Sequence, residues 1–271
     1  MAREPLPDAD PPPHAPDLRP ASAWLARHDL AGARPTPLLA GRLVARERAR
    51  IVAALIAAAL IIAASLAAAS TFGGFRPYRT LSLLVLTVLV AGLVTAQLLL
   101  DRWVRRVDQR AGAELSRRAA HPIQPGWRAV LGPAYAVYAF ATFAGAMALV
   151  GSALAVPDPT VRQLAVVLLI GLLGATAINV VQLRHLLRRP VVAEDEESLT
   201  VDVIMRVEDA RDLTMPNVQL SLPMVLVFGA APVWWGAAAV AYLLLCLFAY
   251  ILLRVRTPPS VTVARRAMSL R

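Results

Sequence analysis

Long apolar segments, separated by charged or turn-forming stretches, constrain the fold of this 271-residue chain more than any other feature. A helix of about twenty residues, rising about 1.5 Å per residue, matches the roughly 30 Å hydrocarbon layer of a membrane. The sequence therefore predicts an all-α, polytopic integral membrane protein with six transmembrane helices arranged in three hairpins. The predicted spans cover residues 51–70, 80–100, 129–156, 161–183, 217–233 and 236–254.

The last two spans are predicted from one apolar stretch, 217–256, which is too long for a single crossing. We expect a break at 229–236, where glycines and Pro232 allow a turn and Trp234 and Trp235 favour the membrane interface. The alternative is a single span that is preceded by a re-entrant segment.

The distribution of arginine predicts the orientation. All 28 basic residues are arginine, and six spans with an internal amino terminus place 21 of them in cytoplasmic segments from residue 42 onward. The external loops then contain only Arg76, Arg79 and Arg162. Because cytoplasmic flanks collect positive charge, we expect six crossings of the cell membrane with both termini in the cytoplasm. The net charge of +10 thus indicates contact with the lipid bilayer, and no nucleic-acid partner is predicted.

Three regions follow from this layout. Residues 1–40 are rich in proline and poor in large apolar side chains, so we expect a largely disordered cytoplasmic tail. Residues 41–256 form the six-helix membrane domain. Residues 257–271 form a short basic tail in the cytoplasm.

An arginine-rich stretch follows the second span and is predicted to form the first of two cytoplasmic amphipathic helices, over 102–118. Apolar residues recur every four positions on one face, while arginines occupy much of the rest. Such a helix either rests on anionic headgroups or couples the protein to a cytoplasmic partner. The basic residues proposed for this interaction are Arg102, Arg105, Arg106 and Arg110.

The second amphipathic helix is predicted over 198–213, within a stretch that is unusually acidic. Eight of the eighteen acidic residues fall between Arg184 and Leu213. An acidic helix is repelled by anionic lipid, so we expect it to pack on protein, with the arginines of 102–118 as its nearest complement. Its predicted interaction residues are Asp202, Glu208, Asp209 and Asp212.

Small residues inside the spans predict where helices approach one another. They form three groups, in which side chains recur four positions apart: Thr87, Ala91 and Thr95; Ala141 and Gly145; Gly171, Ala175 and Asn179. Small side chains allow close backbone approach, and an amide can then hydrogen-bond to the neighbouring helix. Asn179 is interpreted either as such an interhelical bond or as a substrate contact.

Residues that carry chemistry are scarce. The spans contain no clear ionisable residue away from their ends, which argues against ion-coupled transport and intramembrane proteolysis. The four histidines lack metal-ligand spacing, and no phosphate-binding glycine motif occurs. We therefore predict no catalytic, cofactor or metal site, and a protein that is not an enzyme.

The segment Ala193-Glu-Asp-Glu-Glu-Ser-Leu-Thr-Val-Asp202-Val-Ile-Met-Arg206, within a six-span layout, resembles an uncharacterised family of multi-pass membrane proteins of actinobacteria. In layout the resemblance extends over residues 40–256. Members of that family are often encoded near transcriptional regulators and ABC transporter components, and the family has no established activity.

These observations lead to three functional hypotheses. The first is a non-enzymatic accessory or regulatory membrane component that presents its two cytoplasmic helices to a membrane or cytoplasmic partner, or to further copies of itself. The alternative is a permease subunit resembling ABC-2 type exporters, which would use a separate ATPase. A membrane enzyme is the third.

Overall fold

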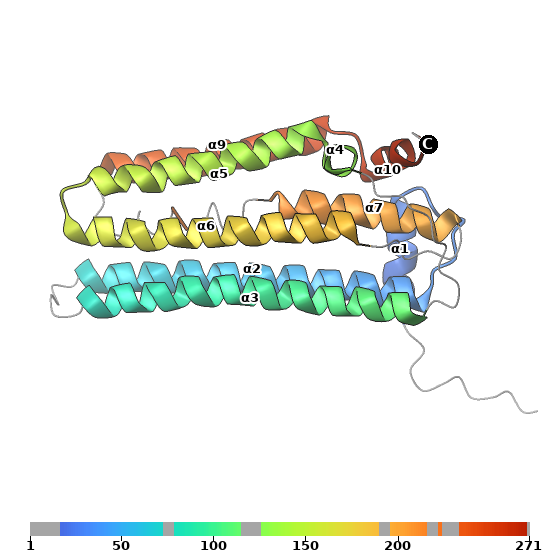
Figure 1. The fold of residues 1–271 in the computed structure, drawn as a ribbon, viewed down its shortest axis with the longest axis horizontal. Helices are drawn as coiled ribbons and strands as arrows, with labels where there is room; N and C mark the ends of the chain where they lie inside the picture. The colour runs from blue at the N-terminus through green and yellow to red at the C-terminus, as the bar shows by residue number, and fades with distance from the viewer. Residues whose placement is uncertain are drawn as a thin grey trace, which may run out of the picture.

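The computed structural model describes residues 17–72, 79–114, 126–189, 196–215, 222–223 and 233–269. Within these ranges the chain is helical and contains no β-strand, so the predicted all-α class is confirmed. The longest helices are α2 (Pro37–Phe72) and α3 (Arg79–Glu114), with 36 residues each, and α6 (Pro159–Arg188), with 30 residues. They run along the long axis of the molecule (Figure 1).

Four helices in the described part of the chain are long and apolar enough to cross a membrane. They lie in α3, α5 (Gly132–Ser152) with the short helix η2 (Ala153–Ala155), α6 and α9 (Val233–Arg256). They overlap the predicted second, third, fourth and sixth spans. The predicted first span, 51–70, lies in α2, and the predicted fifth span, 217–233, falls almost wholly outside the described residues.

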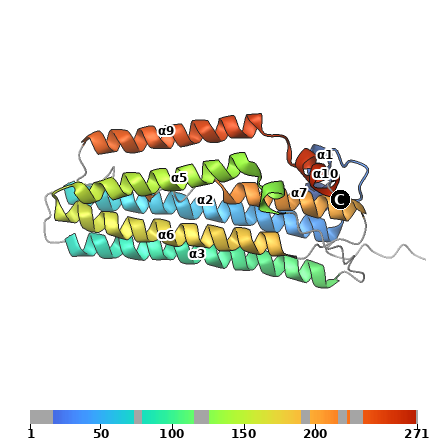
Figure 2. The ribbon, with the colours of Figure 1, turned by 45° about the horizontal axis from the view of Figure 1, so that its top comes forward.

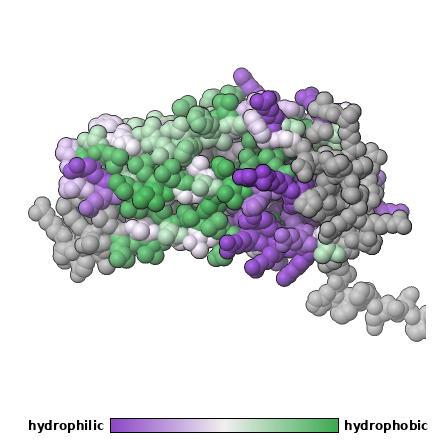
Figure 3. Space-filling view, in the orientation of Figure 1, coloured by the Kyte–Doolittle hydropathy of each residue, from purple (hydrophilic) through white to green (hydrophobic). Residues whose placement is uncertain are grey.

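Large apolar side chains cover the outside of this helical bundle. Phe140, Ile170 and Leu245 are each about two-thirds exposed or more, at 72%, 66% and 67%. Hydrophobic residues form a broad region over the middle and left of the molecule, and hydrophilic residues gather at the right (Figure 3). Such a surface is favourable in hydrocarbon, where the helical backbone satisfies its own hydrogen bonds, and supports a membrane protein.

The helices pack around a shared apolar core. α2 contacts α3, α3 contacts α6, and α5 contacts both α6 and α9 (Figures 1 and 2). The core contains Val90, Leu168, Leu172 and Trp235, all of them buried. The indole nitrogen of Trp235 donates to the carbonyl oxygen of Leu149 at 3.1 Å, which ties α9 to α5.

One end of the bundle, called the polar end below, is built from short helices. These are α1 (Arg19–Arg27), α4 (Trp127–Val130), α7 (Glu196–Leu213) and α10 (Ser260–Ser269) (Figure 1). Trp24 and Leu25 of α1 share an apolar cluster with Ile204 of α7 and Val261 of α10. The first and last described helices therefore meet at the same end of the molecule.

The prediction of disorder over 1–40 is wrong for residues 17–40, while residues 1–16 lie outside the described part. Ala21, Trp24 and Leu25 occur at helical spacing, and all three side chains are buried. They form one apolar face of α1, which α7 and α10 cover. The predicted basic tail, 257–271, likewise contains α10, whose Val261 and Ala264 are buried.

A separate surface helix is also not observed over 102–114, the described part of the predicted 102–118 helix. α3 continues without interruption from Arg79 to Glu114, so the arginine-rich stretch prolongs the second predicted span. No proline or glycine occurs between Leu100 and Arg110 to break the helix. A helix of 36 residues measures about 54 Å, well beyond a hydrocarbon thickness of about 30 Å. α3 thus extends past the membrane and does not lie along its surface.

Candidate functional site

Helix α7 forms the centre of the polar end. The predicted helix over 198–213 is confirmed, with bounds Glu196–Leu213. Every residue from Val201 to Val207 is buried, so the helix is enclosed on all sides along this segment. The enclosed polar side chains are Asp202, with 0% exposure, and Arg206, with 1%. Charges buried this completely require partners, because each loses its hydration.

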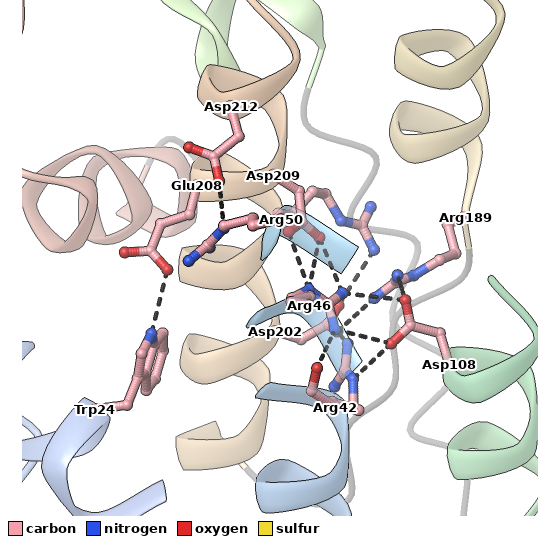
Figure 4. A network of polar contacts seen from close by, with 11 residues as sticks. Trp24, Arg42, Arg46, Arg50, Asp108, Arg189, Asp202, Glu208, Asp209 and Asp212 are labelled. Carbon is pink, nitrogen blue, oxygen red and sulfur yellow. Dashed lines mark hydrogen bonds and ion pairs between the residues drawn. The ribbon is translucent and has the colours of Figure 1, made fainter. Parts of the chain in front are cut away.

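Asp202 receives hydrogen bonds from arginines of three elements. The Nη2 atom of Arg42, on α2, donates to Oδ1 of Asp202 at 2.6 Å. Nη2 of Arg189, which directly follows α6, donates to the same oxygen at 3.2 Å. Nη2 of Arg206, one turn further along α7, donates to Oδ2 at 3.2 Å. The side chains of Arg42, Asp202 and Arg189 converge in Figure 4.

A second buried carboxylate, Asp108 on α3, completes the connection between the helices. It accepts from Nε of Arg42 at 2.9 Å, from Nη2 of Arg46 at 3.0 Å and also from Arg189. Arg46 in turn donates through Nε and Nη2 to Asp209 on α7, with both distances at 2.9 Å (Figure 4). These contacts join α2, α3 and α7 to Arg189, the residue that directly follows α6.

The network contains more positive than negative charge. We define the buried ion network as four arginines and three aspartates: Arg42, Arg46, Arg189, Arg206, Asp108, Asp202 and Asp209. Burial alone would raise the pKa of Asp202, but the nearby arginines Arg42, Arg189 and Arg206 outweigh burial and lower it. The excess of arginine leaves Nε and Nη1 of Arg206 without a hydrogen-bond partner among the described residues.

The expected complement of α7 differs from the observed one. The four described arginines of the stretch predicted to face it do not pair with α7: Arg102, Arg106 and Arg110 are exposed, and Arg105 pairs with Asp101 on the same helix. Residues 115–118 of that stretch lie outside the described part of the chain. The partners come instead from α2 and from the end of α6. Sequence reasoning interpreted those arginines only as topology signals beside the spans.

A smaller polar cluster links α1 to α7. The indole nitrogen of Trp24 donates to Oε2 of Glu208 at 3.2 Å, and Nε2 of His28 lies 2.8 Å from Oε1 of the same carboxylate. Burial lowers the pKa of His28, but hydrogen bonds to Glu208 and to the carbonyl of Trp24 outweigh burial and raise it overall. The fourth predicted acidic residue, Asp212, forms an exposed pair with Arg50 at 3.0 Å.

The predicted small-residue positions divide into two groups. A Cβ atom on Gly171 would lie 2.6 Å from Cγ1 of Val90, and one on Gly145 would lie 2.7 Å from Cε2 of Tyr242. These glycines therefore occupy close helix contacts, and Ala175 is buried beside the first of them. The remaining small positions face outward on their helices: Thr87, Ala91, Thr95 and Ala141.

Asn179 lies on the wall of a cavity. The structure gives its amide no hydrogen bond to another described residue, so the predicted interhelical bond is not observed there. A partly open cavity of about 1790 Å³ runs beside the buried ion network, and Asn179 lines it together with Gln97 and Gln182. Arg46 and Asp108 of the network line the same cavity.

Neither a metal site nor a similarity to a known protein indicates a function for the described residues. Among the residues that the structure describes, no group of three or more histidine, cysteine, aspartate or glutamate side chains is arranged to hold a metal ion. No protein-family model, curated protein or solved structure matches the chain. The function must therefore be inferred from the geometry of the polar end and its cavity.

Proposed function

We propose that this chain is a non-enzymatic accessory or regulatory component of the cell membrane, which crosses the bilayer six times. Both termini are assigned to the cytoplasm. The packing of Trp24 in α1 beside Val261 in α10 supports an even number of crossings, because it brings both described ends of the chain to one side. The concentration of arginine at that side supports its cytoplasmic location.

The observation that carries this proposal is an exposed basic face on the part of α3 beyond the membrane. Arg102, Arg106 and Arg110 are exposed and make no salt bridge to a described residue. The acidic residues of α7 do not neutralise them, because α7 pairs with other arginines. Trp103, 39% exposed, lies next to Arg102. Arginine and tryptophan are enriched where proteins bind one another, so this face suits an acidic surface on a partner protein.

Co-purification in mild detergent tests the proposal. The full chain is compared with a variant that carries Arg102→Glu, Arg106→Glu and Arg110→Glu. The matched control carries Arg256→Glu, Arg265→Glu and Arg266→Glu, the same change of charge at exposed positions of α9 and α10. We expect a protein that binds the wild type and the control but is lost from the α3 variant. An identical set of bound proteins for all three would contradict the proposal.

The alternative function is a permease subunit that uses a separate ATPase. The cavity of about 1790 Å³ at the polar end favours it, because a transported molecule needs a space between the helices. The same purification distinguishes the two functions. A soluble ATPase that is retained, and whose hydrolysis rate changes when the chain is present, would support the permease. A partner without ATPase activity would support the accessory role.

A further inference from the structure

The cavity beside the buried ion network is lined by both apolar and charged side chains. Ala53 of α2, Leu100 of α3 and Leu186 of α6 contribute apolar wall near the cytoplasmic ends of the predicted spans. Nine arginines and six acidic residues also line the cavity, an excess of three positive charges with histidine neutral. A ligand that fits this lining has an apolar part and a negative part.

Three side-chain amides line the cavity deeper in the predicted spans than Leu100 and Leu186. Gln97 comes from α3, and Asn179 and Gln182 come from α6 three positions apart. The Oε1 atom of Gln97 is buried and has no hydrogen-bond partner among the residues that the structure describes. Asn179 and Gln182 likewise make no hydrogen bond to a described residue. A polar group within a membrane protein is costly unless it is paired, so these amides are suited to hydroxyl or ester groups of a ligand.

Three arginines supply positive charge that no acidic residue in the described part of the chain pairs with. Arg48 of α2, Arg188 of α6 and Arg254 of α9 line the cavity and form no salt bridge with a described residue. Arg188 and Arg254 lie in the last turns of their helices. Arg48 precedes the first predicted span by a few residues. All three therefore stand at the depth of the lipid headgroups, and they come from three different helices.

We propose that this cavity binds a phosphate-bearing anionic amphiphile. Arg48, Arg188 and Arg254 hold the phosphate, the amides of Gln97 and Asn179 bind its polar linkage, and the apolar chain lies against α2 and α3. The volume of about 1790 Å³ exceeds the roughly 300–1,000 Å³ of typical small-molecule pockets. This leaves room for a headgroup and a chain together. The proposal depends on neither the protein partner nor the orientation in the membrane.

Binding is tested with the full chain purified in a neutral detergent. The probes are dioctanoyl phosphatidylglycerol, dioctanoyl phosphatidylcholine, which has the same chains but no net charge, and inorganic phosphate, which has no chain. Native mass spectrometry counts the molecules of each probe that are bound.

Two variants distinguish binding in the cavity from non-specific attraction of an anionic lipid to basic residues elsewhere on the surface. The cavity variant carries Arg48→Gln, Arg188→Gln and Arg254→Gln, and the control carries Arg256→Gln, Arg265→Gln and Arg266→Gln, at exposed positions that do not line the cavity. None of the six arginines belongs to the buried ion network, so both variants should fold, and their unfolding temperatures verify this. We expect the affinity for phosphatidylglycerol to fall roughly 5-fold for each cavity arginine that is replaced, and to remain unchanged in the control.

Each other result would overturn the proposal. Equal loss in both variants would mean general attraction to a basic surface. Unchanged binding in the cavity variant would mean that the lipid lies elsewhere. Phosphatidylcholine binding as tightly as phosphatidylglycerol would remove the anionic requirement. Inorganic phosphate displacing the lipid at equal concentration would indicate a site for the free anion, without a role for the chain.

Discussion

At the scale of single residues, Asp202 shows what the buried ion network does. A buried ion pair gains little net stability over an apolar pair, because both charges lose their hydration. Removing one partner is different, since the charge that remains is buried without compensation. Asp202 receives hydrogen bonds from Arg42, Arg189 and Arg206, so its contribution is to fix how α2, α6 and α7 meet.

Replacement of Asp202 should therefore be costly. We expect Asp202→Ala to lower the free energy of unfolding by about 3–5 kcal/mol, because three arginines lose a shared acceptor. The control is Asp212→Ala, which removes an acid whose side chain is 50% exposed and which pairs with an equally exposed Arg50; its effect should stay below about 1 kcal/mol. Thermal unfolding in detergent measures both. Similar effects for the two variants would show that the network does not stabilise the polar end.

His28 should make the polar end sensitive to pH. Burial lowers its pKa in the folded protein, but the hydrogen bonds to Glu208 and to the carbonyl of Trp24, together with the charge of Glu208, outweigh burial and raise the pKa above the ordinary value of 6.5. The stabilisation is then complete below that ordinary value and is lost as the pH rises through the raised pKa. We expect the unfolding temperature to fall as the pH rises above the ordinary pKa of His28, 6.5, and to fall less in His28→Gln. Parallel curves for wild type and variant would contradict this assignment.

The residues of the network show the limit of sequence reasoning at this scale. Asp202 was correctly singled out as part of an acidic helix, but its partner Arg42 lies 160 positions away. An arginine that flanks a span has the same local sequence context whether its side chain faces the cytoplasm or a buried carboxylate. The pairing depends on the packing of α7 between other helices, which no local pattern records.

At the scale of elements, the periodicity of apolar residues predicts individual helices, but it does not predict which helices pack against one another. The helix over 198–213 was expected from its apolar face and is observed as α7, but burial on all sides was not expected. The short apolar face of Trp24 and Leu25 is too small a local signal to predict α1, because the helix is stabilised by distant segments in α2, α7 and α10. The continuity of α3 was overlooked because the change from apolar to charged sequence resembles a boundary between elements.

The contact between α3 and α6 rests on Gly171. A methyl group there would lie 2.6 Å from Cγ1 of Val90, so one of the two side chains must move. We expect Gly171→Ala to lower the free energy of unfolding by about 1–3 kcal/mol. Val90→Ala in the same chain should restore part of the loss. Gly92→Ala is the control, because a Cβ at that position meets nothing within 4 Å. Equal unfolding temperatures for Gly171→Ala and Gly92→Ala would show that α3 and α6 do not approach this closely.

At the scale of the whole molecule, an apolar bundle carries a compact polar end. The bundle follows from the hydropathy of the sequence, and four of its helices are long and apolar enough to cross a membrane. The polar end joins α1 and α10, from opposite ends of the chain, to α7. Contacts between segments this distant in sequence have no local signature, so the membrane part and the helix α7 could be predicted, but the packing of the polar end could not.

Labelling of single cysteines tests the orientation of the whole molecule. Cys246 is buried and is first replaced by Ala. Gln163→Cys is exposed at the start of α6, away from the polar end, and Ala31→Cys is exposed beside α1 (Figure 1). We expect an impermeant maleimide to label Gln163→Cys in intact cells and Ala31→Cys only after the cells are opened. The reverse pattern would place the polar end outside the cell.

Hydrogen exchange of α7 in the full chain tests most directly whether this acidic helix is enclosed by the protein's own arginines. If it is, peptides that cover Val201–Val207 exchange as slowly as the core of α6, and Asp202→Ala makes them exchange faster while α6 stays protected. Rapid exchange of α7 in the wild-type protein, at the rate of an exposed helix, would contradict the account.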